Sequence, residues 1–512
     1  MTQLNELESL RTRVKLLEEQ IRSLGHEPIE IPTSNVSELG PKEGELALDE
    51  YVRYGRQMIL PGFGLPSQLA LRNSSILVLG AGGLGCPALM YLASAGVGKS
   101  RYYSKSRRVT IVDHDLVEVS NLHRQILHGV DMVGRSKVES AKHALLRLNP
   151  SIDIVTHCIS LTLETLPVVF APNVRFHAVL DCTDTPSTRY LLSDVTTRLG
   201  IPLISGAAQR TDGQLVVYNL PPSAPLDPRN AKNHTDPTVN ATEITNTVGP
   251  CMRCIFPSVS RTGAGAERCS DVGVLGPVVG VIGVLMALET IKILTGFGIE
   301  ECQLHTPSML LFTGLSPRPF RNIKLRPRQS KCPGCSTGSP QGLPVLELMA
   351  DLASLQDSYY QYCDVDSHLP NDPILTGARR GEPGMRVKAS VLRDALVSAA
   401  ASSTASLTII DTRPPTEFGI CSIPGSVNVP LSLLLKTPES YISISTPTFV
   451  VCRLGNDSQV AVRALRGALQ AKEDGSQANL DNASSASPQR IVDVIGGLRA
   501  WAQEVDQSFP IY

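Results

Sequence analysis

The sequence has no excess of charge of either sign and few cysteines for its length. Among 512 residues, Lys and Arg number 47 and Asp and Glu number 48. This balance gives no polyelectrolyte surface, so direct nucleic-acid binding is not expected and would need a local patch. Twelve cysteines are too few for a disulfide scaffold. Their Cys-x-x-Cys spacing predicts a reducing compartment, the cytosol.

Long hydrophobic runs are also missing. The N-terminus carries Glu6 and Glu8 and no apolar segment, which argues against a secretory signal or a transit peptide. The longest apolar stretch covers residues 273–288 and contains Pro277. Its length of about 16 residues falls short of the roughly 20 that a membrane span needs. We therefore expect a buried core helix there and no membrane partner.

The length predicts more than one domain, because roughly 100 to 200 residues make one core. Apolar residues at alternating steps of three and four predict an amphipathic helix over residues 4–25, either a dimer seam or a helix packed on the body. With the Pro/Ser/Gly-rich segment after it, this makes a first region, residues 1–45. Two α/β domains are then predicted at 46–335 and 388–512, with a connector at 336–387.

Strand and helix patterns alternate through both large domains. In the first, strands are expected at 74–80, 108–113, 177–183 and 202–208, and helices at 86–95, 137–148 and 189–199. In the second, strand-like runs at 406–413 and 449–457 precede a helix at 458–472 and a strand-and-helix run at 490–501. This alternation predicts parallel sheets, with helices on both faces in the first domain.

A glycine-rich turn stands between the first strand and the first helix. Gly80, Gly82 and Gly85 carry no Cβ to block a phosphate, and the following helix N-terminus favours an anion. Asp113, at the end of the next strand, is placed to accept hydrogen bonds from a ribose. Because dehydrogenases bind NAD with the same turn, these residues alone leave an oxidoreductase open.

The segments after the second and third strands favour a triphosphate over NAD. The run SNLHRQ at 120–125 and Lys137 supply cations, and DCTD at 181–184 supplies carboxylates. A hydride-transfer site needs neither, whereas ATP with Mg²⁺ needs both, because the phosphates must be neutralised and the metal must be held.

Together these motifs resemble the MoeB/ThiF adenylyltransferases, which are relatives of ubiquitin-activating enzymes. The likeness covers about residues 45–335. It rests on YGRQMIL (54–60), GAGGLGCP (80–87), VDHDLVEVSNLHRQ (112–125), the Gly134 and Lys137 segment, DCTD and two Cys-x-x-Cys pairs. It implies a Rossmann-like fold and ATP-dependent adenylation of the C-terminal glycine of a ubiquitin-like protein.

The resemblance also implies nucleotide contacts, position by position. Gly83 would approach the phosphates, Asp113 the ribose and Asp184 the Mg²⁺ ion. The triphosphate would meet Asn121, Arg124 and Lys137. Arg56 matches an arginine that family members supply across a dimer interface, which implies a homodimer. The remaining cofactor-binding candidates are neighbours of these residues, namely Ser120, Leu122, His123, Asp181 and Cys182. The family usually has Asn after the metal-binding aspartate, where this chain has Thr185.

The two Cys-x-x-Cys pairs suit a structural metal. Cys251 and Cys254 form one pair, and Cys332 and Cys335 form the other. Each pair could supply two thiolates to one tetrahedral Zn²⁺, and four thiolates leave no open position for catalysis. One such pair could equally be a redox motif, but two pairs in this family context predict zinc.

A separate cysteine, Cys269 in ERCSDVGVLG, matches a position where relatives of this family keep a cysteine. Its thiolate could attack an acyl adenylate, or it could resolve an acyl disulfide after sulfur has arrived. The sequence leaves both chemistries open.

Cys452 ends an apolar strand and opens the run CRLGNDS ahead of a helix. Backbone N–H groups of such a loop and the helix dipole stabilise a thiolate or a persulfide, and Arg453 adds positive charge. A tyrosine phosphatase requires Arg six residues after the cysteine, where this chain has Ser458. With DTRPPTEF, IPGSVNVP and GGLRAW, the segment resembles a rhodanese domain over about residues 388–512. That resemblance implies sulfur transfer through Cys452.

The fusion of the two domains resembles the eukaryotic family of molybdopterin-synthase adenylyltransferases and sulfurtransferases, which also serves the ubiquitin-related modifier in tRNA thiolation. The likeness implies ATP, Mg²⁺ and Zn²⁺ as cofactors. Its partners would be ubiquitin-like sulfur carriers ending in Gly-Gly and a persulfide donor such as a cysteine desulfurase. The alternatives are an NAD-dependent oxidoreductase and a non-catalytic scaffold for ubiquitin-like proteins. Pyrophosphate exchange with ATP separates all three.

Overall fold

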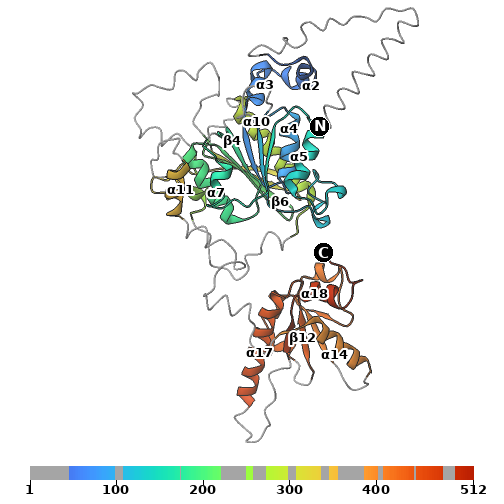
Figure 1. The fold of residues 1–512 in the computed structure, drawn as a ribbon. Helices are drawn as coiled ribbons and strands as arrows, with labels where there is room; N and C mark the ends of the chain where they lie inside the picture. The colour runs from blue at the N-terminus through green and yellow to red at the C-terminus, as the bar shows by residue number, and fades with distance from the viewer. Residues whose placement is uncertain are drawn as a thin grey trace, which may run out of the picture. The chain divides into compact units, whose positions relative to one another are not determined.

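The chain forms two compact units, Met1–Cys363 and Asp364–Tyr512 (Figure 1). The computed structural model describes residues 45–98, 108–172, 174–220, 249–257, 273–297, 307–335, 345–355, 386–401, 407–442, 446–476 and 491–511. The predicted N-terminal helix and Cys269 lie outside these residues. The boundaries 46–335 and 388–512 stay predictions.

The first unit is built on an eight-stranded sheet with the order β3-β2-β1-β4-β5-β6-β7-β8. The strands are β1 (Ile76–Leu79), β2 (Val109–Val112), β3 (Ile154–His157), β4 (Ala178–Asp181), β5 (Leu203–Gln209), β6 (Asp212–Tyr218), β7 (Ser308–Thr313) and β8 (Phe320–Lys324). The four strands predicted from the sequence are β1, β2, β4 and β5. The strand order reverses next to β1. Open α/β sheets bind their ligands at such a reversal, in the crevice outside the carboxyl ends of the strands.

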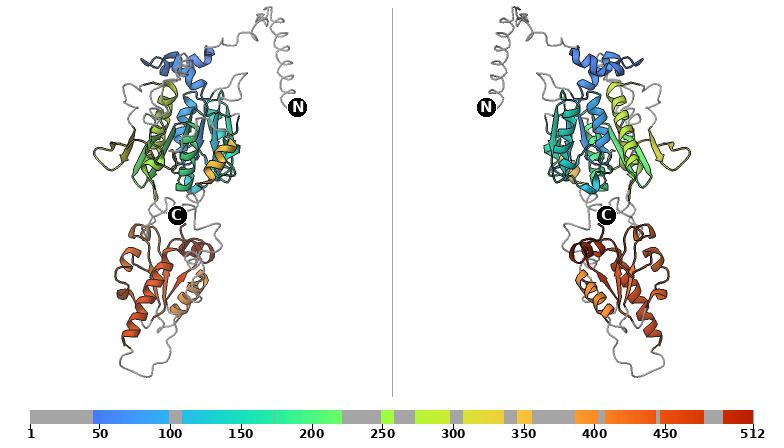
Figure 2. Two further views of the ribbon diagram at one scale, coloured as in Figure 1. Left: turned by 90° about the vertical axis from the view of Figure 1, so that its left-hand side faces the viewer. Right: turned by 90° about the vertical axis from the view of Figure 1, so that its right-hand side faces the viewer.

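The four strands predicted from the sequence run parallel, as expected, and the sheet continues in three antiparallel strands whose direction the sequence left open. The strands from β3 to β5 run parallel, but β6, β7 and β8 are antiparallel to their neighbours. A tight turn after Gln209 joins β5 to β6, with Arg210 at a φ of 55°. A connection this short can join only antiparallel strands. The hairpin of β7 and β8 projects from the rest of the unit in both side views, and all of β8 is exposed (Figure 2).

Helices cover both faces of this sheet, as predicted. One face packs against α4 (Gly85–Ser94), α5 (Lys137–Leu148) and α10 (Gly276–Thr295). The other packs against α6 (Leu166–Val169), α7 (Pro186–Leu199) and α11 (Val345–Ala353). Three further short elements carry site residues or border them, namely η1 (Val119–Asn121), η2 (Val130–Met132) and α9 (Met252–Ile255). Helices α2 (Leu48–Met58) and α3 (Gly64–Arg72) precede β1.

Helix α10 contains the longest apolar stretch of the sequence and is a core helix. By length and composition it could cross a membrane. However, Ile282 and Met286 are fully buried, in the core cluster that also holds residues of β1 and α4. The prediction of a buried helix is therefore confirmed.

Helix α11 lies within the predicted connector, residues 336–387. Its Leu348 and Leu352 are fully buried in the core cluster that also contains Tyr190 and Leu191 of α7. Part of the predicted connector is thus packed into the first unit.

The second unit is a parallel five-stranded sheet with the order β11-β10-β12-β13-β9. Its strands are β9 (Arg386–Val387), β10 (Thr408–Asp411), β11 (Val427–Asn428), β12 (Thr448–Val451) and β13 (Ile491–Val494). Its helices are α14 (Ala389–Ala401), α15 (Pro415–Phe418), α16 (Leu431–Leu434), η3 (Pro438–Tyr441), α17 (Asp457–Ser476) and α18 (Gly497–Glu504). Residues of α14 and α18 share one core cluster, and residues of α16 and α17 share the other. The predicted α/β unit is confirmed.

Candidate functional site

The glycine-rich loop lies at the carboxyl end of β1, directly against the end of β4. A Cβ on Gly80, which has a φ of +98°, would lie 2.6 Å from the carbonyl oxygen of Cys182. A Cβ on Gly85 would lie 1.9 Å from the carbonyl oxygen of Gly80. Glycine is therefore required at both positions, because any side chain would collide with the backbone. Gly83 faces the α10 side, where its Cβ would meet Val279 at 3.0 Å and Arg124 at 3.6 Å.

Two side chains fix this loop from either side. The Ala81 N–H donates to Asp113 Oδ2 at 2.7 Å, and the His128 ring nitrogen Nε2 lies 2.9 Å from the Ala81 carbonyl oxygen. The other ring nitrogen of His128 lies 2.8 Å from Ser140 Oγ on α5. Burial lowers the pKa of His128, so a neutral ring that donates through Nε2 fits this position. The sequence did not single out His128, because its contacts depend on how α5 packs.

The cations after β2 lie beside the loop. Arg124 Nη2 donates to Asn121 Oδ1 at 2.6 Å, and Arg124 Nη1 lies 2.7 Å from His123 Nε2. Lys137, at the start of α5, donates through Nζ to Asp115 Oδ2 at 2.8 Å. The Asp115 N–H in turn donates to Asp113 Oδ1 at 2.9 Å. Lys137 would therefore have to leave Asp115, or share it, to meet a phosphate.

The DCTD turn after β4 contains two aspartates in opposite environments. Asp181 is fully buried and accepts hydrogen bonds from Thr183 Oγ1 and Ser205 Oγ, both at 2.7 Å. Arg189 of α7 pairs with it at 3.8 Å and also donates through Nε to the Thr183 carbonyl oxygen at 3.0 Å. Asp181 therefore orders the turn. Arg189, Thr183 and Ser205 support it and were not singled out from the sequence.

Asp184, by contrast, is exposed. Burial lowers the pKa of Arg124, and the negative charge of Asp184 opposes that shift, so the two groups lie within electrostatic reach. A carboxylate near a guanidinium that itself lies against the glycine-rich loop fits a triphosphate with a divalent ion.

The contacts of the remaining residues that were predicted to bind the nucleotide do not indicate how they would do so. Ser120 Oγ donates to Glu118 at 3.1 Å, Leu122 is half-buried, and Cys182 is buried under the glycine loop. Arg56 is exposed on α2, and no contact with the residues above is observed in the described part of the chain. The nucleotide roles of these residues stay predictions, and that of Arg56 needs a second copy of the chain.

The two Cys-x-x-Cys pairs meet in one buried cluster. Cys251 Sγ lies 3.8 Å from Cys254 Sγ and 3.6 Å from Cys332 Sγ, and Cys254 Sγ lies 3.4 Å from Cys335 Sγ. Zinc bound tetrahedrally at about 2.3 Å requires sulfur atoms about 3.8 Å apart, so the four residues fit a zinc ion. The contact between the two sulfur atoms raises the pKa of Cys251 and lowers the pKa of Cys254.

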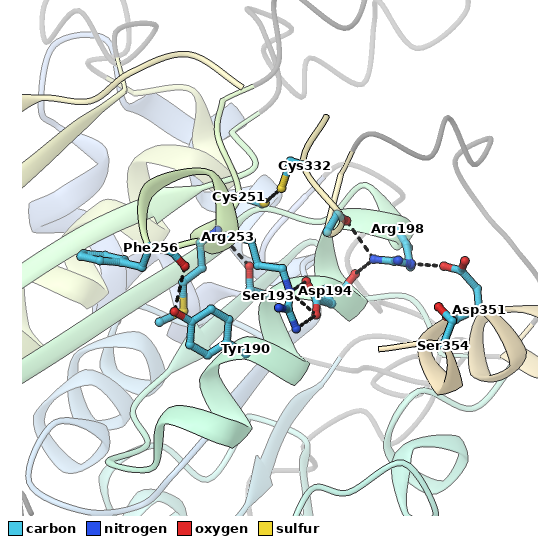
Figure 3. Close-up of polar contacts among 12 residues, drawn as sticks. Tyr190, Ser193, Asp194, Arg198, Cys251, Arg253, Phe256, Cys332, Asp351 and Ser354 are labelled. Carbon is cyan, nitrogen blue, oxygen red and sulfur yellow. Dashed lines mark hydrogen bonds and ion pairs between the residues drawn. The ribbon is translucent and has the colours of Figure 1, made fainter. Parts of the chain in front are cut away.

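Helix α7 anchors both halves of this cluster (Figure 3). Arg253, within the first pair, donates through Nε to the buried carboxylate of Asp194 at 2.9 Å, and its guanidinium lies 5.0 Å from the centre of the Tyr190 ring. Arg198 donates to the carbonyl oxygen of Gly334, within the second pair, at 2.8 Å and also pairs with Asp351 of α11. Since α7 begins directly after the DCTD turn, the cluster braces the helix that carries Arg189.

We expect Cys335→Ser to lose its bound zinc and to lower the melting temperature of the first unit by roughly 10 °C, because metal binding adds directly to the free energy of folding. Elemental analysis and a thermal melt are the measurements. Cys158→Ser, which removes an exposed thiol from the same unit, is the matched control and should keep its metal. A full equivalent of zinc in Cys335→Ser, or none in the wild type, would contradict the assignment.

In the second unit, Cys452 follows β12 and lies in a loop that leads into α17. Its sulfur accepts a hydrogen bond from the Gly455 N–H at 3.1 Å and lies 3.5 Å from Ser458 Oγ. Gly455 has a φ of +81°, and a Cβ there would lie 2.7 Å from the backbone nitrogen of Gly496. The loop therefore aims a backbone N–H at the sulfur. This cradle, at the N-terminus of a 20-residue helix, favours an anion on Cys452.

Comparisons with known proteins match both units. The ThiF family matches residues 54–334, and the Rhodanese-like domain family matches residues 395–504. The Aspergillus terreus protein "Adenylyltransferase and sulfurtransferase uba4" is 38% identical over 490 residues, which cover 92% of this chain and 89% of that protein. The protein of the same name from Ogataea parapolymorpha is 36% identical over 468 residues, which cover 91% of this chain and 100% of that protein. Among solved structures, E. coli MccB aligns with 19% identity, a TM-score of 0.42, and coverage of 58% of this chain and 74% of that chain.

Proposed function

Because the chain belongs to the Uba4-type family of adenylyltransferases and sulfurtransferases, we propose that it adenylates the C-terminal glycine of ubiquitin-like sulfur carriers and then converts it to a thiocarboxylate. The enzyme is bifunctional, with one activity for each family match. The observation that carries the proposal is the pair of sites. In one unit, Arg124 lies against a phosphate-type loop and within electrostatic reach of Asp184. In the other, a hydrogen-bonded thiol, Cys452, lies at a helix N-terminus.

In the first reaction, a carboxylate oxygen of the carrier attacks the α-phosphorus of ATP, and pyrophosphate leaves. The N–H groups around Gly83 and the guanidinium of Arg124 bind the phosphates, with Asn121 orienting that guanidinium. Asp113, held by two backbone N–H groups, keeps further acceptor capacity for the ribose. Lys137 adds charge once it releases Asp115. Asp184 would hold Mg²⁺.

In the second reaction, the terminal sulfur of a Cys452 persulfide attacks the acyl carbon, and AMP leaves. The product is an acyl disulfide between Cys452 and the carrier. A thiolate, for which Cys269 is our choice, then attacks the Cys452 sulfur and releases the thiocarboxylate, leaving a disulfide that a cellular thiol reduces. Cys269 forming a thioester directly with the carrier is the alternative chemistry.

We further propose which carriers and sulfur donor the enzyme uses, where it acts and in which oligomeric state. The carriers would be the small subunit of molybdopterin synthase and the ubiquitin-related modifier, so that sulfur reaches the molybdenum cofactor and the wobble uridine of cytosolic tRNA. A cysteine desulfurase or a similar persulfide donor would load Cys452. The enzyme would act in the cytosol as a homodimer, with Arg56 contributed across the interface.

Carrier-dependent exchange of pyrophosphate with ATP is the experiment that tests this function. We expect exchange only when a carrier with an intact Gly-Gly terminus is present, because the adenylate forms on that carboxylate. A carrier lacking the last glycine is the matched control. Binding of the carrier without exchange would point to a scaffold, and binding of NAD without exchange would point to an oxidoreductase.

A further inference from the structure

Within the described part of the chain, two groups that can donate hydrogen bonds lie next to the Cys452 sulfur, and one of them is a side chain. The Gly455 N–H is 3.1 Å away, and Ser458 Oγ is 3.5 Å away. Ser458 is fully buried, at 0% exposure, and Cys452 is 3% exposed. Among the described residues, the serine hydroxyl has no hydrogen-bond partner other than this sulfur.

The loop around the sulfur cannot shift easily. Arg386 Nη2 and Gln459 Nε2 both donate to the Gly455 carbonyl oxygen, at 3.1 and 2.6 Å. The Leu498 N–H donates to the Cys452 carbonyl oxygen at 2.9 Å. A Cβ on Gly497 would lie only 2.1 Å from that same oxygen. The relative positions of the sulfur, the Gly455 N–H and the Ser458 hydroxyl are therefore fixed by α17 and α18.

We propose that Ser458 is a catalytic residue of the sulfur-transfer site, whose hydroxyl donates a hydrogen bond to the Cys452 thiolate and, after loading, to the inner sulfur of the persulfide. A thiol can donate to the hydroxyl oxygen, but once the proton is gone only the hydroxyl can donate, and it can rotate to do so. Hydrogen bonds to charged groups are about twice as strong as neutral ones, so this contact favours the ionised form.

The hydroxyl acts on a defined step, and this assignment rests on the proposed function of Cys452. During loading, the Cys452 thiolate attacks the outer sulfur of a donor persulfide. One S–S bond forms on Cys452, the donor S–S bond breaks, and the donor leaves as a thiolate. Ser458 increases the thiolate population that begins this step. In the acyl disulfide that follows, the sulfur is neutral and the hydroxyl contributes less.

Charged side chains around the loop have interaction partners, whereas Ser458 is an uncharged neighbour of the sulfur that can be replaced without changing these ion pairs. Arg386 pairs with Asp493 at 3.1 Å, and Arg453 and Asp457 each have an interaction as well. Arg453 and Asp457 both follow Cys452 in the loop and carry opposite charges. Replacing Ser458 changes none of these charges.

The test is the pH dependence of alkylation of Cys452 by iodoacetamide in the full-length protein, followed by peptide mass spectrometry. We expect Ser458→Ala to move the half-maximal rate to higher pH, so that alkylation below both midpoints is about tenfold slower, the effect of losing one charge-assisted hydrogen bond. The plateau at high pH should be unchanged. Ser458→Thr, which keeps the hydroxyl, should resemble the wild type.

Ser426→Ala is the matched control, because it removes a serine hydroxyl that donates to the Ile423 carbonyl oxygen in the same unit. An identical alkylation profile for Ser458→Ala and the wild type would overturn the proposal. So would an equal displacement in Ser426→Ala. Loading with inorganic polysulfide, read as the gain of one sulfur on the Cys452 peptide, is measured in parallel. A displaced alkylation profile with no loading of the wild type would leave Ser458 as the group that activates the thiolate and would remove the sulfur-carrier function.

Discussion

The Cys452→Ala protein is expected to form no thiocarboxylate while it exchanges pyrophosphate with ATP at the wild-type rate. On the proposed function, the activated acyl group is made beside the glycine-rich loop of the first unit, whereas the sulfur depends on the thiol that contacts Gly455 and Ser458. Removal of a nucleophile abolishes covalent transfer and leaves the other reaction intact. Mass spectrometry of the carrier, with a gain of about 16 daltons when sulfur replaces oxygen, is the measurement.

Cys421→Ala provides the control for this variant. Cys421 is a half-buried thiol in the same unit, and its sulfur lies 3.7 Å from the Pro510 carbonyl oxygen. Thiocarboxylate should form normally in that protein. If Cys452→Ala produced as much thiocarboxylate as the wild type, the rhodanese unit would have no part in the mechanism, and Cys269 would become the sulfur carrier.

Asp184→Ala is expected to lower carrier-dependent pyrophosphate exchange by at least about 100-fold, the usual effect of removing one group that stabilises a developing charge. Without this carboxylate, Mg²⁺ loses a ligand and the leaving pyrophosphate loses part of its charge neutralisation. Because Asp184 is exposed and Asp181 supplies the buried contacts of the turn, the fold should persist. Exchange of radiolabelled pyrophosphate at several Mg²⁺ concentrations is the assay, with a thermal melt to check stability.

The control for Asp184→Ala is Glu347→Ala, which removes an exposed carboxylate from α11 of the same unit. It should exchange pyrophosphate at the wild-type rate. Wild-type exchange by Asp184→Ala, with an unchanged dependence on Mg²⁺, would show that the metal is held elsewhere.

The grouping of the candidate nucleotide-binding residues at one edge of the sheet could be predicted from sequence because these residues follow strands. Asp113, Asp181 and the glycine loop each stand where a strand ends, and the carboxyl ends of neighbouring parallel strands meet at one edge. What each side chain contacts could not be predicted. The spacing in DCTD does not indicate that Asp181 is buried under Arg189 while Asp184 faces solvent, because the position of α7 decides that. In the same way, only packing shows that Lys137 bonds to Asp115.

The directions of β6, β7 and β8 could not be predicted for a similar reason. Strand-like composition identifies a strand but not its direction, and the antiparallel pairing of β6 with β5 follows from the short turn between them. The helix α11 was missed because it is short and amphipathic and becomes stable only against α7, where Leu348 and Leu352 are buried.

The sequence by itself determined which chemical groups this protein has, because each motif is local: a phosphate-type turn after a strand, cations and carboxylates at the next strand ends, two Cys-x-x-Cys pairs and a cysteine loop before a helix. Only the tertiary structure decided which groups meet. Cys251 and Cys332 stand 81 residues apart yet lie 3.6 Å from each other, and His128 reaches the loop at Ala81 across 47 residues. The physical reason is that burial and long-range packing, rather than spacing along the chain, bring distant side chains together and determine which of them stay available for chemistry.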